Sequence, residues 1–160
     1  MIKTYLKNII LLNILCNIAL ANEDITSIMS DKRFVKCYIP ANKTYVKMEL
    51  TYVTDVLSQR KGLMFKKNIK EGQGLLLKVD NNKIGRIWMK NMLTSIDIIF
   101  LAEDGSILTS IENAQPCSKD IECTITSVKN TAYIIETSPN FIINNYLYYS
   151  DKCLISKQDK

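Results

Sequence analysis

Short segments of alternating apolar and polar residues, separated by turn residues, run along most of this 160-residue chain. The clearest case surrounds Asp104-Gly105, a dipeptide typical of hairpin turns because glycine accepts a positive φ. The apolar segments 96–102 and 106–111 flank it, and a period of two residues puts one face of a strand into a core. We therefore expect an antiparallel hairpin here, within a mainly β fold.

The same signals predict the other elements. We expect further strands at 34–39, 45–53, 74–79, 84–89, 132–137 and 152–155, a helix at 54–64 capped by Thr54, and an irregular or helical stretch at 139–146. Turn residues between the third and fourth of these strands predict that they pair as a hairpin. Short strands with frequent turns indicate a compact β-sandwich or barrel, here with one or two short helices.

The first 21 residues are organised like a cleavable signal peptide. Lys3 and Lys7 give a positively charged start, residues 9–20 form a short, mostly apolar run, and Ala19-Leu20-Ala21 supplies the small residues that a signal peptidase recognises. The sequence therefore predicts an exported protein, either periplasmic or secreted.

We expect cleavage before Asn22, a flexible lead-in over 22–33 and a single β domain over 34–156. An uncleaved membrane anchor is the first alternative, although the apolar run is shorter than the ~20 residues of a spanning helix. A lipoprotein lipidated at Cys16 is the second, although Leu15 stands where such signals need a small residue. After signal cleavage we expect no stable membrane insertion.

Four cysteines remain once the leader is removed: Cys37, Cys117, Cys123 and Cys153. An even number in an exported chain indicates disulfides. Of the three possible pairings we favour Cys117 with Cys123, which closes a small loop, and Cys37 with Cys153, which joins the ends of the domain. A zinc site is the alternative, but the sequence has no Cys-x-x-Cys pair.

Charge and composition disfavour several classes of function. The formal net charge of +5 falls to +3 without the leader's Lys3 and Lys7, and the basic residues alternate with acidic ones instead of forming a stripe. This argues against a nucleic-acid partner. The chain has no histidine, which removes the usual general base and the commonest metal ligand. We expect neither a metal nor a cofactor.

The residue types that bind ligands gather around Trp88-Met89-Lys90-Asn91 and Asp97. Trp88 is suited to stack on a ligand, Lys90 to meet an anion, and Asn91 and Asp97 to supply hydrogen bonds. Arg60, at the end of the expected helix, is suited to clamp a carboxylate with two parallel hydrogen bonds.

Two other interpretations of the same residues remain open. In a structural one, Trp88 and Met89 simply pack. Lys90 or Arg60 then pairs with Asp97 or Glu136 in a polar cluster beneath the sheet. In a catalytic one, two carboxylates, Asp97 and Glu136, converge as in a hydrolase, or Lys90 activates Ser95.

A set of short motifs resembles the bacterial and archaeal family called domain of unknown function 192. The motifs are Arg60-x-Gly62-Leu63-Met64, Trp88-Met89-Lys90-Asn91, Asp97-Ile98-Ile99-Phe100, Asp104-Gly105, Pro116-Cys117, Cys123 and Ala132-Tyr133-x-x-Glu136. The resemblance implies a compact β-sandwich of jelly-roll type, often exported, with no established activity. It also implies that any site common to the family is intact here.

Together these features predict an exported, non-enzymatic module that binds a small molecule, a glycan or a cell-envelope component. The residues expected to bind are Arg60, Trp88, Lys90, Asn91, Asp97 and Glu136. The alternative is a carboxylate- or lysine-dependent hydrolase acting on envelope material. A third hypothesis, an interaction protein, requires a large exposed apolar patch.

Overall fold

The computed structural model describes residues 31–80, 84–117, 123 and 125–157. The predicted leader and nearly all of the lead-in lie outside the described residues. All the elements below belong to the unit that begins at Lys32. Within the described residues, no helix is both long enough and apolar enough to span a membrane.

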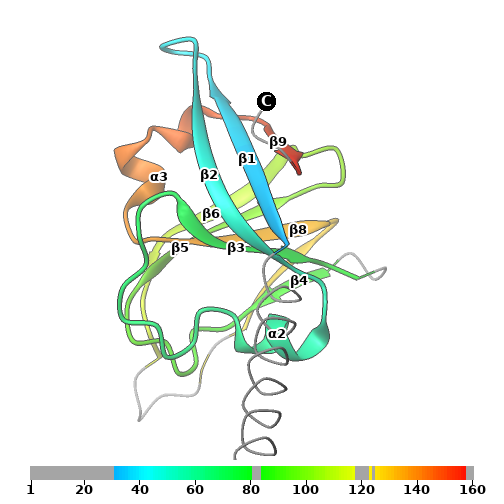
Figure 1. Ribbon diagram of the computed structural model, residues 1–160, viewed down its shortest axis with the longest axis vertical. Helices are drawn as coiled ribbons and strands as arrows, with labels where there is room; N and C mark the ends of the chain where they lie inside the picture. Colours follow the sequence, from blue (N-terminus) through cyan, green and yellow to red (C-terminus); the bar gives the residue numbers. More distant parts are fainter. Residues whose placement is uncertain (1–30, 81–83, 118–122, 124, 158–160) are drawn as a thin grey trace, which may run out of the picture. The chain divides into compact units, whose positions relative to one another are not determined.

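In the described part of the chain, seven strands form one sheet that curls into half a barrel (Figure 1). Its strands are β1 (Lys32–Ile39), β2 (Thr44–Val53), β3 (Gln73–Lys78), β5 (Ile96–Leu101), β6 (Ile107–Ala114), β8 (Tyr133–Thr137) and β9 (Cys153–Ser156). Their order is β6-β5-β8-β3-β2-β1-β9, antiparallel throughout except for the parallel pair β2 and β3. A separate two-stranded ribbon joins β4 (Ile84–Ile87) to β7 (Thr126–Lys129).

The mainly β class and the central hairpin are confirmed. Strands β5 and β6 pair on either side of Asp104-Gly105, where the Gly105 φ of 85° is of the kind that favours glycine. The Ala102 N–H donates to the Ser106 carbonyl, 2.9 Å away, across the turn. The jelly-roll connectivity that the resemblance implies stays a prediction.

The expected hairpin between β3 and β4 is wrong. Strand β3 lies between β2 and β8, so both of its edges already have partners. Strand β4 instead pairs with β7, which the sequence analysis missed because Thr126-Ser127-Val128-Lys129 is mostly polar. The ribbon is thus made from two segments about 40 residues apart in the chain.

The first helix is shorter than predicted. Helix α2 spans Val56–Lys61, and its N-cap is Asp55 rather than Thr54, because the Asp55 carboxylate accepts a hydrogen bond of 2.8 Å from the Ser58 N–H. The helix ends at Gly62, whose φ of 47° leaves the helical region. The predicted irregular stretch contains α3 (Phe141–Asn144), and the 3-10 helix η1 (Leu147–Tyr149) follows it.

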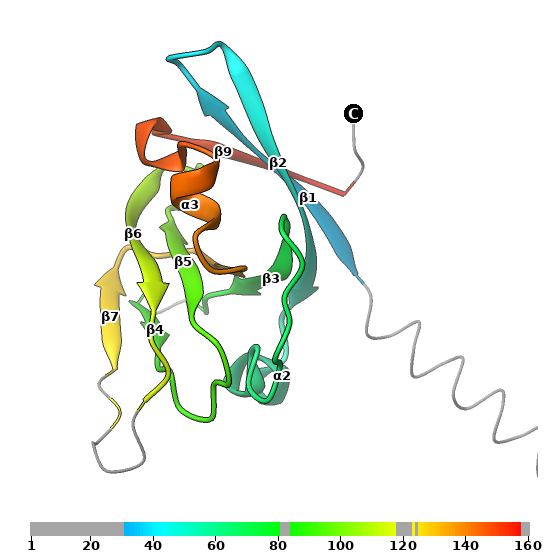
Figure 2. The same cartoon turned by 90° about the vertical axis from the view of Figure 1, so that its left-hand side faces the viewer.

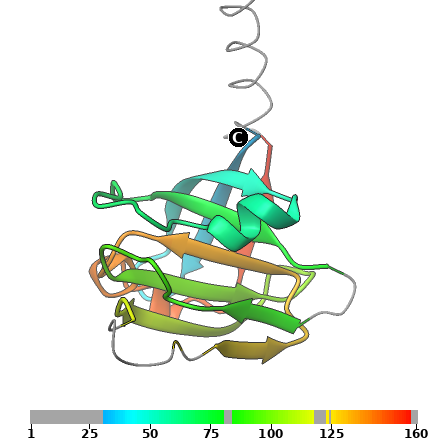
Figure 3. The ribbon, with the colours of Figure 1, turned by 90° about the horizontal axis from the view of Figure 1, so that it is seen from below.

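Two apolar clusters occupy the two faces of the sheet, and β5 separates them. Ile99 and Leu101 belong to one cluster and Ile96, Ile98 and Phe100 to the other, as the two-residue period of a strand requires. The first cluster is covered by α3 and η1 within the curl of the sheet (Figure 2). The second is covered by the segment that follows α2 and by β4 (Figure 3). All six residues of β5 are therefore buried.

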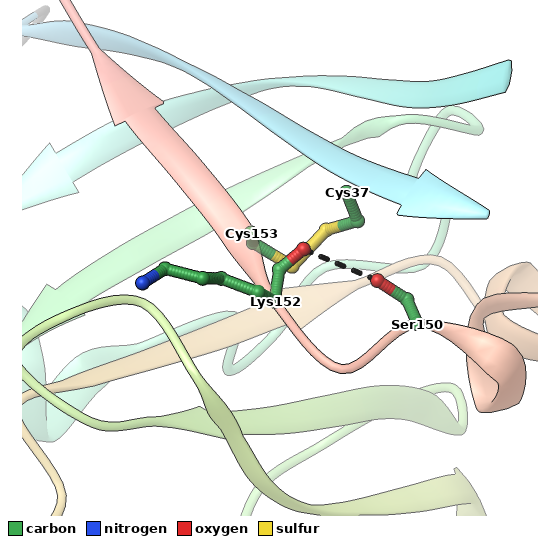
Figure 4. The surroundings of a disulfide bond; sticks show 4 residues. All are labelled: Cys37, Ser150, Lys152 and Cys153. Atoms are coloured by element: carbon green, nitrogen blue, oxygen red, sulfur yellow. Dashed lines mark hydrogen bonds between the residues drawn. A yellow bond between two sulfur atoms is a disulfide. The ribbon is translucent and has the colours of Figure 1, made fainter. Parts of the chain in front are cut away.

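Both favoured disulfide pairings are confirmed. Cys37 on β1 and Cys153 on β9 are register partners, with Cα atoms 4.0 Å apart, and their bond ties the last strand to the first (Figure 4). Beside it, the Ser150 hydroxyl donates to the Lys152 carbonyl over 3.2 Å. The second bond closes the short loop between Cys117 and Cys123.

Candidate functional site

A cleft of about 380 Å³ opens between α2 with the segment after it and the sheet face of the second cluster. The side chain of Gln59 fixes α2 over the ends of two strands by donating to the Lys78 carbonyl (2.6 Å) and to the Val53 carbonyl (3.3 Å). Helix α2 thus lies beside β2 and β3 (Figure 3). The helix end and the sheet face together form two walls of the cleft.

Glu136 lies at the bottom of this cleft. On β8 it is opposite Leu75 of β3 and Ile98 of β5, so its side chain points to the face of the second cluster. Only 6% of its surface is exposed. Its Oε2 accepts a hydrogen bond of 3.2 Å from the Leu63 N–H. Its Oε1 has no hydrogen-bond partner among the described residues, and Glu136 is one of the residues that line the cleft.

The environment of Glu136 favours its neutral form. Burial raises the pKa of this carboxyl to about 7, because water is removed from the charged form, while the Leu63 N–H acts in the opposite direction. Gly62 allows the close approach. A Cβ at this position would lie 2.9 Å from Oε2. The side chain at the bottom of the cleft is therefore one that exchanges a proton near neutral pH.

The walls of the cleft combine an apolar surface with basic groups. Its lining residues are Val56, Gln59, Arg60, Lys61, Gly62, Leu63, Met64, Leu77, Lys78, Val79, Asp80, Ile84, Arg86, Ile87, Trp88, Met92, Ile125, Ile134 and Glu136. Trp88 is 39% exposed, so its ring is accessible to a ligand. Throughout the described ranges, no carboxylate lies within salt-bridge distance of Arg60 or Arg86.

Three of the predicted site residues line the cleft: Arg60, Trp88 and Glu136. Lys90 lies beside them, with its Nζ 5.4 Å from the centre of the Trp88 ring, a distance typical of a cation–π contact. Both partners are exposed, so Trp88 is not a core residue.

Asn91 joins two loops next to the cleft and does not line it. Its φ of 58° lies in the left-handed region that asparagine tolerates. Its carbonyl accepts a hydrogen bond of 3.0 Å from the Phe65 N–H, and its Nδ2 lies 3.8 Å from the Met64 sulfur. Asn91 therefore holds the segment after β4 against the segment after α2.

Asp97 lies outside the cleft and is fully buried. Its Oδ1 accepts from the N–H groups of Asn113 (2.7 Å) and Asn140 (3.1 Å), and its Oδ2 accepts from the N–H of Ile142 (2.7 Å). These bonds fix the start of α3 and the end of β6. The carboxylate is thus occupied by the backbone, which gives Asp97 a structural role where the sequence predicted a ligand contact.

The geometry does not assemble either predicted catalytic pair in the cleft. Asp97 is the register partner of Thr137, whereas Glu136 is the partner of Ile98, so the two carboxylates point to opposite faces of the sheet. Neither Lys90 nor Ser95 lines the cleft. Among the described residues, no group of three or more His, Cys, Asp or Glu side chains is placed to hold a metal ion.

Sequence reasoning missed two contributors to the cleft, Arg86 and Gly62. Arg86 is the one exposed residue of the short strand β4, and its only sequence signal is its alternation with Gly85 and Ile87. Gly62 was named only as part of the motif Arg60-x-Gly62-Leu63-Met64. Its contact with Glu136 joins positions more than 70 residues apart and has no local signal.

A second, smaller hollow of about 250 Å³ lies on the opposite face of the sheet, beside η1. Its lining residues are Ile99, Ile107, Thr109, Ser110, Ile142, Leu147, Tyr148 and Ser150. None of these described lining residues is charged. Tyr148 and its exposed neighbours Tyr146 and Tyr149 form a surface to which the interaction hypothesis applies.

The profile of a family described as uncharacterized, domain of unknown function 192 (DUF192), matches residues 38–153. The chain belongs to the DUF192 family. This confirms the resemblance of the sequence motifs. No activity comes with the family, and the search of curated proteins found no match.

Solved structures support the fold of this DUF192 chain. A protein from Sinorhizobium meliloti 1021, proposed to be a transcription regulator, matches with a TM-score of 0.67 and 23% identity, over 80% of this chain and 95% of that one. A protein of unknown function from Novosphingobium aromaticivorans matches with a TM-score of 0.65 and 20% identity, over 76% of this chain and 83% of the other. At such identities the similarity establishes the fold alone.

Proposed function

We propose that this DUF192 protein is an exported, non-enzymatic module that binds a small molecule in the cleft beside α2. The observation that carries the proposal is a buried carboxyl group, Glu136, lining a hollow that also has an accessible tryptophan and two arginines for which the described residues supply no carboxylate partner. Binding sites commonly combine a mainly apolar lining with a few converging polar groups and a perturbed pKa.

The size of the cleft favours a small molecule over a glycan chain or an envelope surface. A volume of about 380 Å³ lies near the lower end of the range for small-molecule pockets, roughly 300 to 1,000 Å³. Binding is favoured over hydrolysis because Glu136 and Asp97 point to opposite faces of the sheet. A single carboxyl group is sufficient to orient a ligand.

Export is supported by the two disulfides together with the predicted leader. Disulfides persist in oxidising compartments and are rare in the reducing cytosol. N-terminal sequencing of the protein recovered from the producing cells tests this part of the proposal. A mature chain that starts at Asn22 supports export, and a chain that retains Met1 with free thiols contradicts it.

Ligand binding is testable with the chain's single tryptophan, because Trp88 lines the cleft and is the sole source of tryptophan fluorescence. A library of small carboxylates, amines, sugars and nucleosides would be screened by fluorescence and by thermal shift. A ligand at 100 times its Kd stabilises the folded state by about 2.7 kcal/mol. We expect at least one class to change the fluorescence and raise Tm together.

Two variants locate the binding. Trp88→Ala removes a wall of the cleft, whereas Tyr148→Ala removes a similarly exposed ring at the second hollow. We expect the ligand-induced rise in Tm to be lost in Trp88→Ala and kept in Tyr148→Ala. The opposite pattern, or an equal rise in both variants, contradicts binding in the cleft.

A further inference from the structure

We propose that the ligand of the cleft is an amphipathic anion: a small molecule with an apolar body and one carboxylate or phosphate group held by Arg60 and Arg86. This inference rests on the proposed function and specifies the chemical class that the site accepts. It follows from the balance of charge, the apolar lining and the position of Glu136.

The charged groups that line the cleft are mostly basic. Arg60 and Lys61 come from the end of α2, Lys78 from β3 and Arg86 from β4, against the acidic Asp80 and Glu136. Lys78 is already engaged, since its Nζ lies 3.5 Å from a Glu103 carboxylate oxygen and 4.2 Å from the centre of the Tyr133 ring.

Arg60 and Arg86 differ from Lys78 because the described part of the chain places no carboxylate within salt-bridge distance of either. A guanidinium presents paired N–H donors that fit the two oxygens of a carboxylate or phosphate. Two such groups from different elements, α2 and β4, line one cleft. The cleft therefore offers a place for negative charge that the described residues do not fill.

The remaining lining accounts for the apolar body of the ligand. Leu63, Leu77, Ile87, Met92 and Ile134 belong to the second core cluster and also border the cleft. The ring of Trp88 adds an accessible flat surface. An alkyl chain or ring placed here leaves water and gains contacts with these side chains. A ligand with charge alone would leave this surface unused.

Glu136 makes anion binding sensitive to pH. In its neutral form the carboxyl adds a hydrogen-bond donor at the bottom of the cleft, and in its ionised form it adds a negative charge that repels the ligand. The charged groups that share the cleft with it are Arg60 and Lys61 from α2, Arg86 from β4, Lys78 from β3 and Asp80 after β3. Among these groups, Glu136 is the one whose pKa is raised to about 7 by burial, so its charge changes near neutral pH.

The test compares four probes with the same eight-carbon chain: octanoate, octyl phosphate, octanol and octylamine. Binding to the full folded chain is followed by Trp88 fluorescence at low salt. We expect both anions to bind at least about tenfold more tightly than octanol, as one good charge-assisted contact allows, and octylamine to bind more weakly than octanol.

A charge-matched pair of variants tests the two arginines. Arg60→Gln with Arg86→Gln should reduce the affinity for octanoate to that for octanol. The control, Lys43→Gln with Lys157→Gln, removes two positive charges from exposed residues that do not line the cleft, and should keep the preference for anions. Equal losses in both double variants would mean that only the overall charge matters and would overturn the inference.

Glu136→Gln tests the pH dependence of binding, because glutamine keeps the size of the side chain but has no proton to exchange. In the wild type, octanoate binding should weaken by about tenfold as pH rises from about 6 to about 8, and in Glu136→Gln it should stay constant. Identical pH profiles overturn the role of Glu136.

The outcomes also separate this inference from the proposed function. Octanol binding as tightly as octanoate, with the signal lost in a Leu77→Phe variant that narrows the cleft, leaves the binding function intact and overturns the anion preference. Failure of all four probes overturns the ligand class. Failure of the broader library as well overturns the proposed function.

Discussion

Removal of the bond between Cys37 and Cys153 should destabilise the protein far more than removal of the bond between Cys117 and Cys123. The first joins positions 116 residues apart, and the second joins positions six apart. Restriction of the unfolded chain gives about 5 kcal/mol for the long loop and about 2.3 kcal/mol for the short one at 25 °C. The larger loss of stability for the first bond follows from the length of the loop alone.

Urea unfolding measures the loss of stability in each of two double variants, Cys37→Ala with Cys153→Ala and Cys117→Ala with Cys123→Ala. For a domain of this size about 1 kcal/mol corresponds to roughly 4 °C, so Tm should fall by about 20 °C in the first double variant and about 9 °C in the second. The first should also have the larger increase in m-value, because the unfolded chain expands when the long loop opens.

The m-value separates chain entropy from packing. Cys37 and Cys153 are fully buried, so their replacement also removes apolar contacts, but lost packing does not raise the m-value. Equal losses of stability in the two double variants, or a loss in the first with an unchanged m-value, would refute the reasoning from loop length.

Three further predictions concern the carboxyl groups and their neighbours. Gly62→Ala should lower stability by about 1–3 kcal/mol in urea unfolding and weaken ligand binding, because its φ of 47° strains alanine and the new Cβ meets Glu136; unchanged binding contradicts the contact. Asp97→Asn should cost about 2–4 kcal/mol, because an amide cannot accept all three backbone N–H bonds as a carboxylate does; full stability with lost ligand binding would instead make Asp97 a ligand contact. The free energy of unfolding of the wild type should fall by about 3 kcal/mol as pH rises from about 4.5 to about 7, because the pKa of Glu136 is higher in the folded than in the unfolded state. The same pH dependence in Glu136→Gln contradicts this.

The sequence predicted those features that depend on neighbouring residues. Alternation and the Asp104-Gly105 turn were enough to place β5 and β6 as a hairpin, and cysteine spacing was enough to favour the observed pairs. The edges along which strands pair were not predictable in the same way. Turn residues between β3 and β4 suggested a hairpin, but long-range pairing with β2 and β8 occupies both edges of β3.

The site was predicted only in part, because residue types are visible in the sequence and long-range strand pairing is not. Arg60, Trp88 and Glu136 were recognised by residue type, and all three line one cleft. Asp97 was also chosen by type, but a carboxylate in a strand covered on both faces must find its partners in the backbone. Arg86 reaches the cleft only because β4 pairs with β7, a pairing that local signals do not indicate.

The most direct test of ligand binding in this cleft is an amide NMR titration of the oxidised protein with octanoate, with the Trp88 side-chain N–H included. We expect the largest shifts at the Leu63 N–H, which is bonded to Glu136, at Gly62 and at the Trp88 indole. The amide signals of Thr109 and Tyr148, which line the second hollow, should not shift. Shifts centred on Thr109 and Tyr148, with Leu63 and Trp88 unchanged, would contradict binding in the cleft.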